Sequence, residues 1–230
     1  MVTADPDVSV PAALIGDPTR AVFLAALTEA RALPASELAA RAGVSAQTAS
    51  GHLTKLVQGG LLTFQRRGRQ RYYRLADPAI AAALEALAAI APRREPRSLR
   101  ESDAAVALRA ARTCYDHLAG RLGVALTDAL VADRCLVEAV GRYAVTERGA
   151  ARLAPLGVNV DELAKARRAL ARPCLDWSER RPHVAGALGA ALTQRLFDLR
   201  WIERARGRAV RVTDRGRREL REQLGVKLGD

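Results

Sequence analysis

The second half of the chain contains the same stretch of sequence twice. Residues 117–127 are HLAGRLGVALT and residues 183–193 are HVAGALGAALT, an offset of 66 residues. A second match follows at an offset of 67, between VTERG at 145–149 and VTDRG at 212–216. Two matching stretches at nearly the same offset indicate that a whole structural unit has been duplicated. Residues 103–230 are therefore expected to contain two similar units in tandem.

Each copy has the same predicted order of elements. The apolar pattern and the glycines predict a helix, a glycine-containing turn, a short helix, a hairpin and a final helix that starts after a threonine. The two hairpins are expected to turn near Gly141 and Gly207. We therefore predict two degenerate winged-helix-like repeats in tandem, at about residues 113–158 and 179–226.

The first 91 residues predict a separate winged helix-turn-helix. Helix starts are expected at Asp17-Pro18, at the cap candidates Ser36 and Ser45, and at Asp77-Pro78. Gly43 lies between the second and third of these helices, where a helix-turn-helix needs a tight turn. Residues 61–75 alternate around Arg67-Gly68 and predict a β-hairpin, which would be the wing.

Two prolines among charged residues, in PRREPRS at 92–98, predict an exposed linker between the two parts. The predicted fold is mainly α-helical with small β-hairpin wings. It comprises a DNA-binding and dimerisation domain at 1–91, a linker at 92–102 and a duplicated effector or dimer-support domain at 103–230. Aromatic residues make up only 4% of the chain, so Ala, Leu and Val must build the core, which favours close-packed helices over a sandwich or barrel.

The chain is strongly basic, with a net charge of +12 and an isoelectric point near 10.8. Residues 16–76 carry +6 of this charge, which favours a polyanionic partner such as double-stranded DNA. The start of the chain lacks the basic and apolar regions of a secretory signal, and the most apolar stretch, 78–91, is too short to span a membrane. Three widely spaced cysteines do not suit a disulfide framework. We therefore expect a cytoplasmic protein with no membrane partner.

Polar residues of the third predicted helix and of the wing indicate DNA reading. The helix offers hydrogen-bonding side chains of the right length for base edges and phosphates: Ser45, Gln47, Thr48, Ser50 and Lys55. The hairpin carries arginines suited to phosphate or a narrow minor groove: Arg66, Arg67, Arg69 and Arg71. We expect Gln47, Thr48 and Ser50 to read bases, and Lys55 and the arginines to neutralise phosphate.

This part of the chain resembles the ArsR/SmtB family of bacterial winged-helix repressors. The resemblance covers about residues 8–91 and rests on VSAQTASGHLTKL at 44–56, GLL at 60–62 and RQRYYRL at 69–75. It implies a homodimer joined through the first and last helices of the domain, with residues 77–91 against the partner, and operator binding that an effector relieves. It also places Gln47, Thr48, Ser50 and His52 on the recognition helix, and Arg69 and Arg71 on the wing.

Two positions on the recognition helix need separate treatment. His52 is either a half-buried packing residue or a base reader. Gly51 departs from the family pattern, which usually has a polar residue there, and a glycine inside a helix costs about 1 kcal/mol relative to alanine. The sequence assigns it no role.

The sequence does not place the effector at either familiar metal site of the family. The first helix of the reading pair, 36–42, has no thiol, and the last helix, 79–91, has neither Asp nor His. The thiols and two of the three histidines lie in the repeats instead. We expect Cys114 and His117, three residues apart, on one flank of a helix, and the duplication gives His117 and His183 equivalent positions.

One pseudo-symmetric pocket would then be lined by four residues: Cys114, His117, Cys174 and His183. Thiolate and imidazole suit zinc or a similar ion, while two thiols suit a redox disulfide or a thiol-reactive arsenic, antimony or organic effector. The alternative is purely structural, because cysteine and histidine also pack in cores. Cys135, in the apolar run 130–137, is expected to be a core residue.

Taken together, these features predict a sequence-specific, DNA-binding transcriptional regulator that is not an enzyme. The expected protein is a homodimeric repressor released by a metal, redox or small-molecule effector sensed in the second domain. Two alternatives stay open: an enzyme that uses Cys114 with His117 as a nucleophile pair, and an architectural protein that coats DNA without reading sequence. The sequence names neither the operator nor the inducer.

Overall fold

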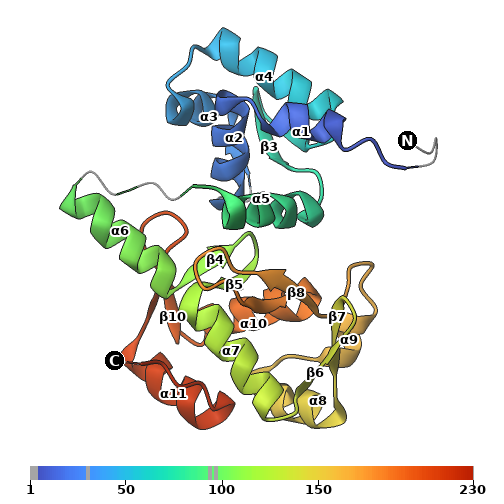
Figure 1. The fold of residues 1–230 in the computed structure, drawn as a ribbon, viewed down its shortest axis with the longest axis vertical. Helices are drawn as coiled ribbons and strands as arrows, with labels where there is room; N and C mark the ends of the chain where they lie inside the picture. Colours follow the sequence, from blue (N-terminus) through green and yellow to red (C-terminus); the bar gives the residue numbers. More distant parts are fainter. Residues whose placement is uncertain (1–4, 30–31, 93–94, 96–97, 230) are drawn as a thin grey trace. The chain divides into compact units, whose positions relative to one another are not determined.

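The structure is a computed structural model of the 230-residue chain that describes residues 5–29, 32–92, 95 and 98–229. The chain forms two compact units, residues 1–84 and 85–230 (Figure 1). The predicted linker at 92–102 lies partly outside the described residues, and helix α6 (Leu99–Ala110) already occupies its last part. Among the described residues, no single helix has the length and apolar character needed to cross a membrane. Helices α1 and α2, which are bent relative to each other, reach that length and composition only when they are counted together.

The first unit is a winged helix-turn-helix. Its elements are, in order, α1 (Ser9–Ile15), α2 (Pro18–Glu29), β1 (Leu33–Pro34), α3 (Ala35–Ala42), α4 (Ala46–Gln58), β2 (Leu62–Arg67), β3 (Gln70–Leu75) and the start of α5 (Pro78–Ile90). Strands β2 and β3 form the predicted hairpin, and β1 joins it to give the sheet order β1-β3-β2. Fully buried side chains of α2, α3 and α4 form its interior: Phe23, Leu24, Leu27, Leu38, Leu53 and Leu56.

The turn between α3 and α4 confirms the predicted helix-turn-helix. Gly43 has a φ of 66°, a left-handed conformation that a residue with a side chain adopts only with strain. Ser45 caps α4, because its side chain accepts a hydrogen bond from the Thr48 backbone N–H at 3.1 Å. The turn and the cap together fix where the recognition helix begins.

The predicted cap at Ser36 is wrong. Helix α3 begins one residue earlier, at Ala35, and the residue before it is Pro34. Pro34 lies in β1 opposite Tyr72 of β3, so the chain passes directly from the sheet into the helix. A proline suits this place because a helix start has no partner for the N–H that proline lacks.

The second unit contains the two sequence repeats. Its elements are the end of α5, then α6, β4 (Arg112–Cys114), β5 (His117–Ala119), α7 (Gly120–Ala132), β6 (Leu136–Ala139), β7 (Arg142–Val145), α8 (Glu147–Leu153), η1 (Ala154–Leu156), α9 (Val160–Ala164), β8 (Arg172–Leu175), β9 (Pro182–Ala185), α10 (Gly186–Asp198), β10 (Ile202–Arg204), β11 (Val210–Val212) and α11 (Asp214–Leu224). Each repeat consists of a hairpin, a long helix, a second hairpin and a final helix.

The structure confirms the last elements of each repeat and corrects the first. The second hairpins do turn at Gly141 and near Gly207, and Thr146 and Thr213 cap the helices that follow them. The first element, however, is a β-hairpin and not a helix. Residues 112–114 and 117–119 are buried throughout, and a short buried run fits a strand as well as a helix.

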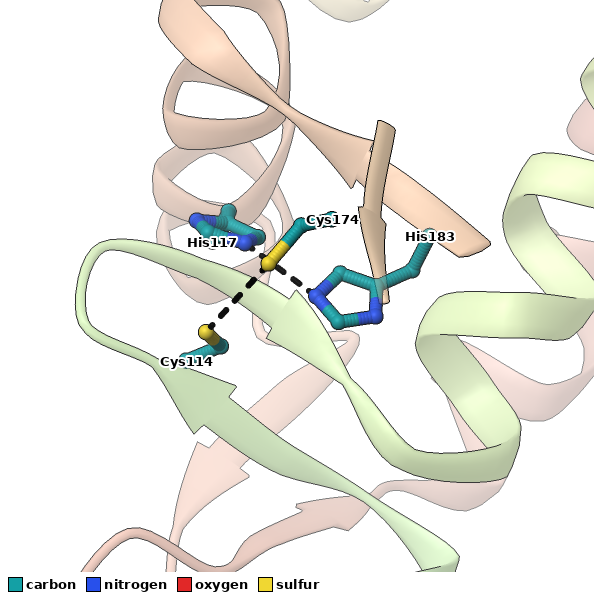
Figure 2. Close-up of side chains that lie close together, drawn as sticks. All are labelled: Cys114, His117, Cys174 and His183. Atoms are coloured by element: carbon teal, nitrogen blue, oxygen red, sulfur yellow. Dashed lines mark hydrogen bonds between the residues drawn. The ribbon is translucent and has the colours of Figure 1, made fainter. Parts of the chain in front are cut away.

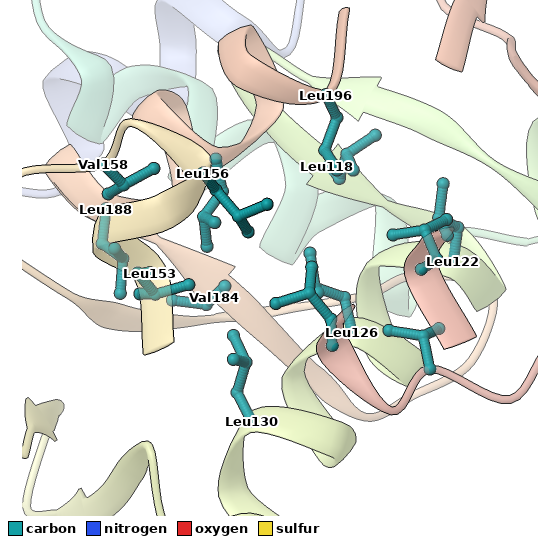
Figure 3. Close-up of a cluster of buried hydrophobic side chains, with 14 of the residues drawn as sticks. Leu118, Leu122, Leu126, Leu130, Leu153, Leu156, Val158, Val184, Leu188 and Leu196 are labelled. Carbon is teal, nitrogen blue, oxygen red and sulfur yellow. The ribbon is translucent and has the colours of Figure 1, made fainter. Parts of the chain in front are cut away.

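One core fills the second unit and draws on both repeats. Leucines at helical spacing along α7 and α10 meet side chains from α8, η1 and β9, as Figure 3 shows for part of the cluster: Leu118, Leu122, Leu126, Leu130, Leu153, Leu156, Val158, Val184, Leu188 and Leu196. Helix α7 packs against β9 of the other repeat, and α10 packs against β5. The repeats are therefore interlocked, and neither has a core of its own. Cys135 is fully buried in this core, as expected.

Candidate functional site

Helix α4 buries one face in the first unit and leaves a polar face exposed. Ala49, Leu53 and Leu56 point inward at helical spacing. The exposed residues include every predicted DNA contact on this helix except His52: Ser45, Gln47, Thr48, Ser50 and Lys55. Ser45 and Thr48 also contact each other, with their hydroxyl oxygens 2.9 Å apart. Among the described residues, Gln47 and Ser50 have no such side-chain partner and stay available at the start of the helix.

His52 faces the body of the unit. Its Nδ1 lies 3.5 Å from Asp17 Oδ1, and its ring meets the Phe23 ring edge-on with centroids 6.3 Å apart. Only 19% of its side chain is exposed. The geometry therefore favours the packing interpretation of His52 over base reading.

Gly51 lies on the exposed side of α4. A Cβ placed on it would meet no atom within 4 Å, so packing inside the unit does not require a glycine there.

The wing presents the predicted arginines to solvent. Arg66 and Arg71 lie opposite each other in the β2–β3 register, and Arg69 lies in the turn between the strands. Aromatic rings support two of the guanidinium groups, since Arg67 lies over Tyr72 at 5.4 Å and Arg71 over Phe64 at 4.9 Å. Within the part of the chain that the structure describes, none of the four predicted arginines forms an ion pair with an acidic residue. Their charges are available to a polyanion.

The second site is a buried cluster of Cys114, His117, Cys174 and His183 (Figure 2). The structure brings together all four residues that the sequence singled out, but not in the predicted way. Cys114 and His117 do not lie on one flank of a helix; they face each other across the β4–β5 hairpin. Tyr115, at a φ of 59°, makes the tight turn between them and is incompatible with a continuous helix.

Cys174 and His183 form the equivalent cross-strand pair in the β8–β9 hairpin. The loop of this hairpin spans residues 176–181, whereas the first hairpin turns through residues 115 and 116 alone. This longer loop, together with one further strand pair, Leu175 opposite Pro182, explains why the cysteines are 60 residues apart while the histidines are 66 apart. Each repeat thus contributes one cysteine and one histidine from the same hairpin.

The four side chains converge on one point. The two sulfur atoms are 3.9 Å apart, the two histidine Nε2 atoms are 3.2 Å apart, and all four candidate ligand atoms lie within 4.8 Å of one another. None of the four residues is more than 5% exposed. In Figure 2 the cysteines and histidines of the two hairpins point toward one another in the space between the hairpins.

An aspartate lies behind each histidine. Asp116 Oδ1 is 3.2 Å from His117 Nδ1, and Asp176 Oδ2 is 3.4 Å from His183 Nδ1. Both Nδ1 atoms therefore face a carboxylate, and both Nε2 atoms face the centre of the cluster. Sequence reasoning missed these aspartates, although each follows a cysteine in a Cys-x-Asp pattern that the two hairpins share.

Hydrogen bonds and ion pairs hold both aspartates in the charged form. Burial opposes ionisation of Asp116, but hydrogen bonds from His117 and from Arg168 (2.7 Å) outweigh it and lower its pKa to about 2. Burial likewise opposes ionisation of Asp176. Its contacts with His183, Arg112 (3.0 Å) and the Gly120 backbone N–H (2.6 Å) lower its pKa well below the usual range.

The two thiols differ in acidity. The hydrogen bond from the Cys114 thiol lowers the pKa of Cys174 against the effect of burial, and His117 and His183 lower it further. The same contact, together with burial, raises the pKa of Cys114. The cluster therefore favours one thiolate beside one thiol in the absence of an added charge.

The fold and the exposed basic face define the class of the protein: a winged-helix, DNA-binding regulator of transcription. Residues 15–63 match a family model described as a helix-turn-helix domain. The chain is 43% identical to the uncharacterized HTH-type transcriptional regulator YdfF of Bacillus subtilis (strain 168), over 97% of this chain and all of the relative. The chain therefore belongs to this family of HTH-type transcriptional regulators.

Solved structures resemble part of the chain. The transcriptional repressor BigR of Xylella fastidiosa is 25% identical, covering 38% of this chain and 88% of its own, with a TM-score of 0.35. The cadmium sensor CMTR of Mycobacterium tuberculosis is 32% identical, covering 40% and 94%, with a TM-score of 0.33. A homodimeric winged helix-turn-helix fragment from Mycobacterium bovis, described as a possible ArsR-family regulator, is 23% identical, covering 37% and 86%, with a TM-score of 0.33.

Proposed function

We propose that the protein is a homodimeric transcriptional repressor of the ArsR/SmtB type, which leaves its operator when the second unit binds an effector. The observation that carries the DNA-binding role is the exposed polar face of α4 beside an arginine-rich wing. In this proposal residues 1–91 bind DNA and dimerise, and residues 103–230 receive the signal. A regulator of this kind acts on the chromosome, so we place it in the cytoplasm.

The DNA contacts divide by chemistry. Gln47 and Ser50, with Thr48, read base edges in the major groove, since their side chains are exposed on one face of α4. Lys55 and the wing arginines, Arg66, Arg67, Arg69 and Arg71, contact phosphates, which fixes the register of the helix but carries no sequence information. The resemblance also places His52 on the recognition helix; its contacts with Asp17 and Phe23 support a role in positioning α4.

Exposed apolar side chains support the dimer. Leu87 and Ile90 on α5 are 44% and 81% exposed, and Val8 and Val10 near the start of the chain are 73% and 55% exposed. Isolated exposed apolar residues are ordinary on a surface, but Leu87 and Ile90 fall on the last helix of the domain, which the family resemblance assigns to the interface. Val10 lies on α1, the first helix of the unit, and Val8 directly precedes it. The partner of this surface is a second copy of the chain.

The buried cluster of Cys114, His117, Cys174 and His183 is the proposed effector site. Its soft donors admit a metal ion or a thiol-reactive species. A chain of buried charges leads away from it within the second unit. Asp176 behind His183 pairs with Arg112, and Arg112 Nη2 lies 3.7 Å from Glu85 Oε2 on α5. Because α5 is the proposed dimer helix, this chain supports coupling between the effector site and the dimer.

Selection of operator DNA tests the regulator. The full-length protein is used to select duplexes from a random library, and its affinity for the selected and a scrambled duplex is measured by fluorescence anisotropy at fixed salt. We expect the selected duplex to bind at least about a thousandfold more tightly, as specific sites generally do. Equal affinities would contradict sequence-specific regulation and favour the architectural alternative.

A transcription assay in vitro tests the repressor role. The protein should reduce transcription from a promoter that carries the selected site, and an increase would contradict that role.

Light scattering after gel filtration tests the dimer. We expect the wild-type protein to have the mass of two chains and Ile90→Asp to shift it toward one, because a charge would be buried in the interface. Val140→Asp is the matched control, since Val140 is fully exposed in the β6–β7 turn and lies outside the proposed interface. A wild-type monomer, or dimer loss in both variants alike, would contradict the assignment of α5.

A further inference from the structure

We propose that the buried cluster is a closed tetrahedral site for one d10 metal ion of the Zn2+ type. The ligands are Cys114 Sγ, His117 Nε2, Cys174 Sγ and His183 Nε2. The inference names the effector class of the proposed function and rests on that function only for its regulatory consequence. The coordination itself is argued from the four residues and their surroundings.

The sulfur–sulfur and nitrogen–nitrogen distances in the cluster match two edges of a tetrahedron. A tetrahedral edge is about 1.63 times the distance from centre to corner, so zinc–sulfur bonds of about 2.3 Å give a sulfur–sulfur edge of about 3.8 Å. Zinc–nitrogen bonds of about 2.0–2.1 Å give a nitrogen–nitrogen edge of about 3.3–3.4 Å. The structure has 3.9 Å between the sulfurs and 3.2 Å between the Nε2 atoms. These two edges are therefore already close to those of an occupied site, and all four ligand atoms lie within 4.8 Å of one another.

The donor set selects the class of ion. Two thiolates and two imidazoles are soft to intermediate donors, which suit zinc and its heavier relatives and do not suit magnesium or calcium. Binding releases the remaining thiol protons to solvent, after which two thiolates balance the two charges of the ion and both histidines are neutral. The occupied centre then carries no net charge, which suits a site where no ligand residue is more than 5% exposed.

The aspartates provide the second, independent observation. Histidines that ligate metals generally donate their other ring N–H to a carboxylate, which fixes the tautomer and orients the ring. Asp116 Oδ1 is within hydrogen-bond distance of His117 Nδ1. Asp176 Oδ2 faces His183 Nδ1 at 3.4 Å, and this buried nitrogen has no hydrogen-bond partner among the described residues. Both rings have Nε2 toward the centre. Two such arrangements around one point are not needed for packing alone.

Two equivalent glycines let each long helix pack closely on its own hairpin, at the Leu118 and Val184 carbonyls, and beside the histidine of the other repeat. Gly123 of α7 lies behind His183, where an added Cβ would be 3.6 Å from the histidine Cβ, and Gly189 of α10 lies behind His117, with a distance of 3.1 Å. The helix of each repeat therefore supports the histidine of the other. An ion at the centre would join the two hairpins and tighten the interlocked repeats, which is how occupancy would reach the rest of the second unit.

Cobalt substitution tests the site on full-length protein prepared with chelator and reductant and then freed of chelator. We expect one Co2+ per chain, with the intense visible bands of tetrahedral cobalt and a sulfur-to-cobalt charge-transfer band, both abolished by one equivalent of Zn2+ and unaffected by Mg2+. Weak octahedral bands, or no binding by protein whose thiols are fully reduced, would overturn the proposal. Because this measurement uses the wild-type chain, it does not depend on how any variant folds.

Variants then assign the ligands, with native mass spectrometry as a second readout. Cys114→Ser should lose intensity in the sulfur-to-cobalt charge-transfer band, and His117→Gln should lose the tetrahedral bands. Each variant should bind Zn2+ at least a hundredfold more weakly. Cys135→Ser is the matched control: it also replaces a buried thiol of the second unit, and it should keep one ion at unchanged affinity. Asp116→Asn should weaken Zn2+ binding about 10–100-fold while keeping the tetrahedral spectrum. Full affinity in Cys114→Ser, or equal losses in Cys114→Ser and Cys135→Ser, would overturn the assignment.

Failure of the site and failure of the proposed function have different results. DNA affinity is measured on the selected duplex with metal-free and Zn2+-loaded protein. Specific DNA binding without any tetrahedral Co2+ spectrum would overturn the metal site, while the assignment of the protein as a DNA-binding regulator would still hold. A tetrahedral spectrum with the same DNA affinity in both states would uphold the site and overturn release by this effector. Weaker DNA binding by the Zn2+-loaded protein supports both.

Discussion

Arg112 donates a hydrogen bond to Asp176 at 3.0 Å, and both side chains are completely buried although 64 residues separate them. Arg112 begins the first hairpin of one repeat, and Asp176 lies in the loop of the equivalent hairpin of the other. The pair is supported on several sides: the Gly120 N–H and Ser178 also bond to Asp176, and the Arg112 guanidinium lies over the Trp177 ring at 4.4 Å. One ion pair thus joins the two repeats directly behind His183.

Removing the charge of Arg112 should be severely destabilising. In Arg112→Met, a side chain of similar length leaves Asp176 buried without its arginine, whereas Glu85 keeps its ion pair with Arg208. Breaking a buried pair typically costs about 3–5 kcal/mol. Urea denaturation measures the loss of unfolding free energy. The control is Arg181→Met, whose ion pair with Asp128 is largely exposed and should be worth at most about 1 kcal/mol. Similar losses in the two variants would contradict a structural role for the Arg112–Asp176 pair.

Two glycine substitutions should change stability in opposite directions. An added Cβ at Gly123 would lie 2.6 Å from the Leu118 carbonyl oxygen, so Gly123→Ala must displace backbone and should cost about 1–3 kcal/mol. An added Cβ at Gly51 would meet nothing within 4 Å, so Gly51→Ala should stabilise α4 by up to about 1 kcal/mol. Thermal unfolding of both variants by circular dichroism gives the comparison. A stabilised Gly123→Ala would argue against the close approach of α7 to β5.

Gln47→Ala should reduce recognition of the selected operator only. Loss of a base-specific pair of hydrogen bonds costs about 1–3 kcal/mol on the correct site, which is roughly a 5–150-fold loss of affinity. Binding to scrambled DNA should barely change, because Gln47 contributes no charge. Anisotropy titrations with both duplexes at the same salt concentration test this. If the variant weakens on both duplexes to the same extent, Gln47 does not read sequence.

Arg69→Ala should weaken binding to every DNA sequence and reduce its salt dependence. Each phosphate contact contributes about one unit to the slope of log affinity against log salt, so the slope should become shallower by about one. The measurement is a series of titrations at increasing salt. Arg134→Ala serves as the control, since this arginine lies in the second unit and removes the same charge far along the chain from the wing. An unchanged slope in Arg69→Ala would remove Arg69 from the phosphate contacts.

Local signals in the sequence were sufficient for most of the first unit. The Asp17-Pro18 start, the Ser45 cap and the turn at Gly43 each depend on residues within a few positions of one another, and all three are present in the structure. The threonine caps of the second unit, at Thr146 and Thr213, were predictable for the same reason. The Ser36 cap failed because Pro34 was already held in the sheet, and that pairing with Tyr72 is a long-range contact.

The tertiary structure decided how the cysteines and histidines meet. The sequence by itself determined that the second half is duplicated and that His117 and His183 are equivalent. It did not determine that residues 112–119 form a hairpin, because a buried run this short has no periodicity that separates strand from helix. It also did not show Asp116 and Asp176 behind the histidines. Which way each aspartate and histidine points follows from strand register. The meeting of the two hairpins follows from the packing of α7 and α10 on the opposite repeats, since contacts between cysteines 60 residues apart and histidines 66 apart leave no local pattern to read.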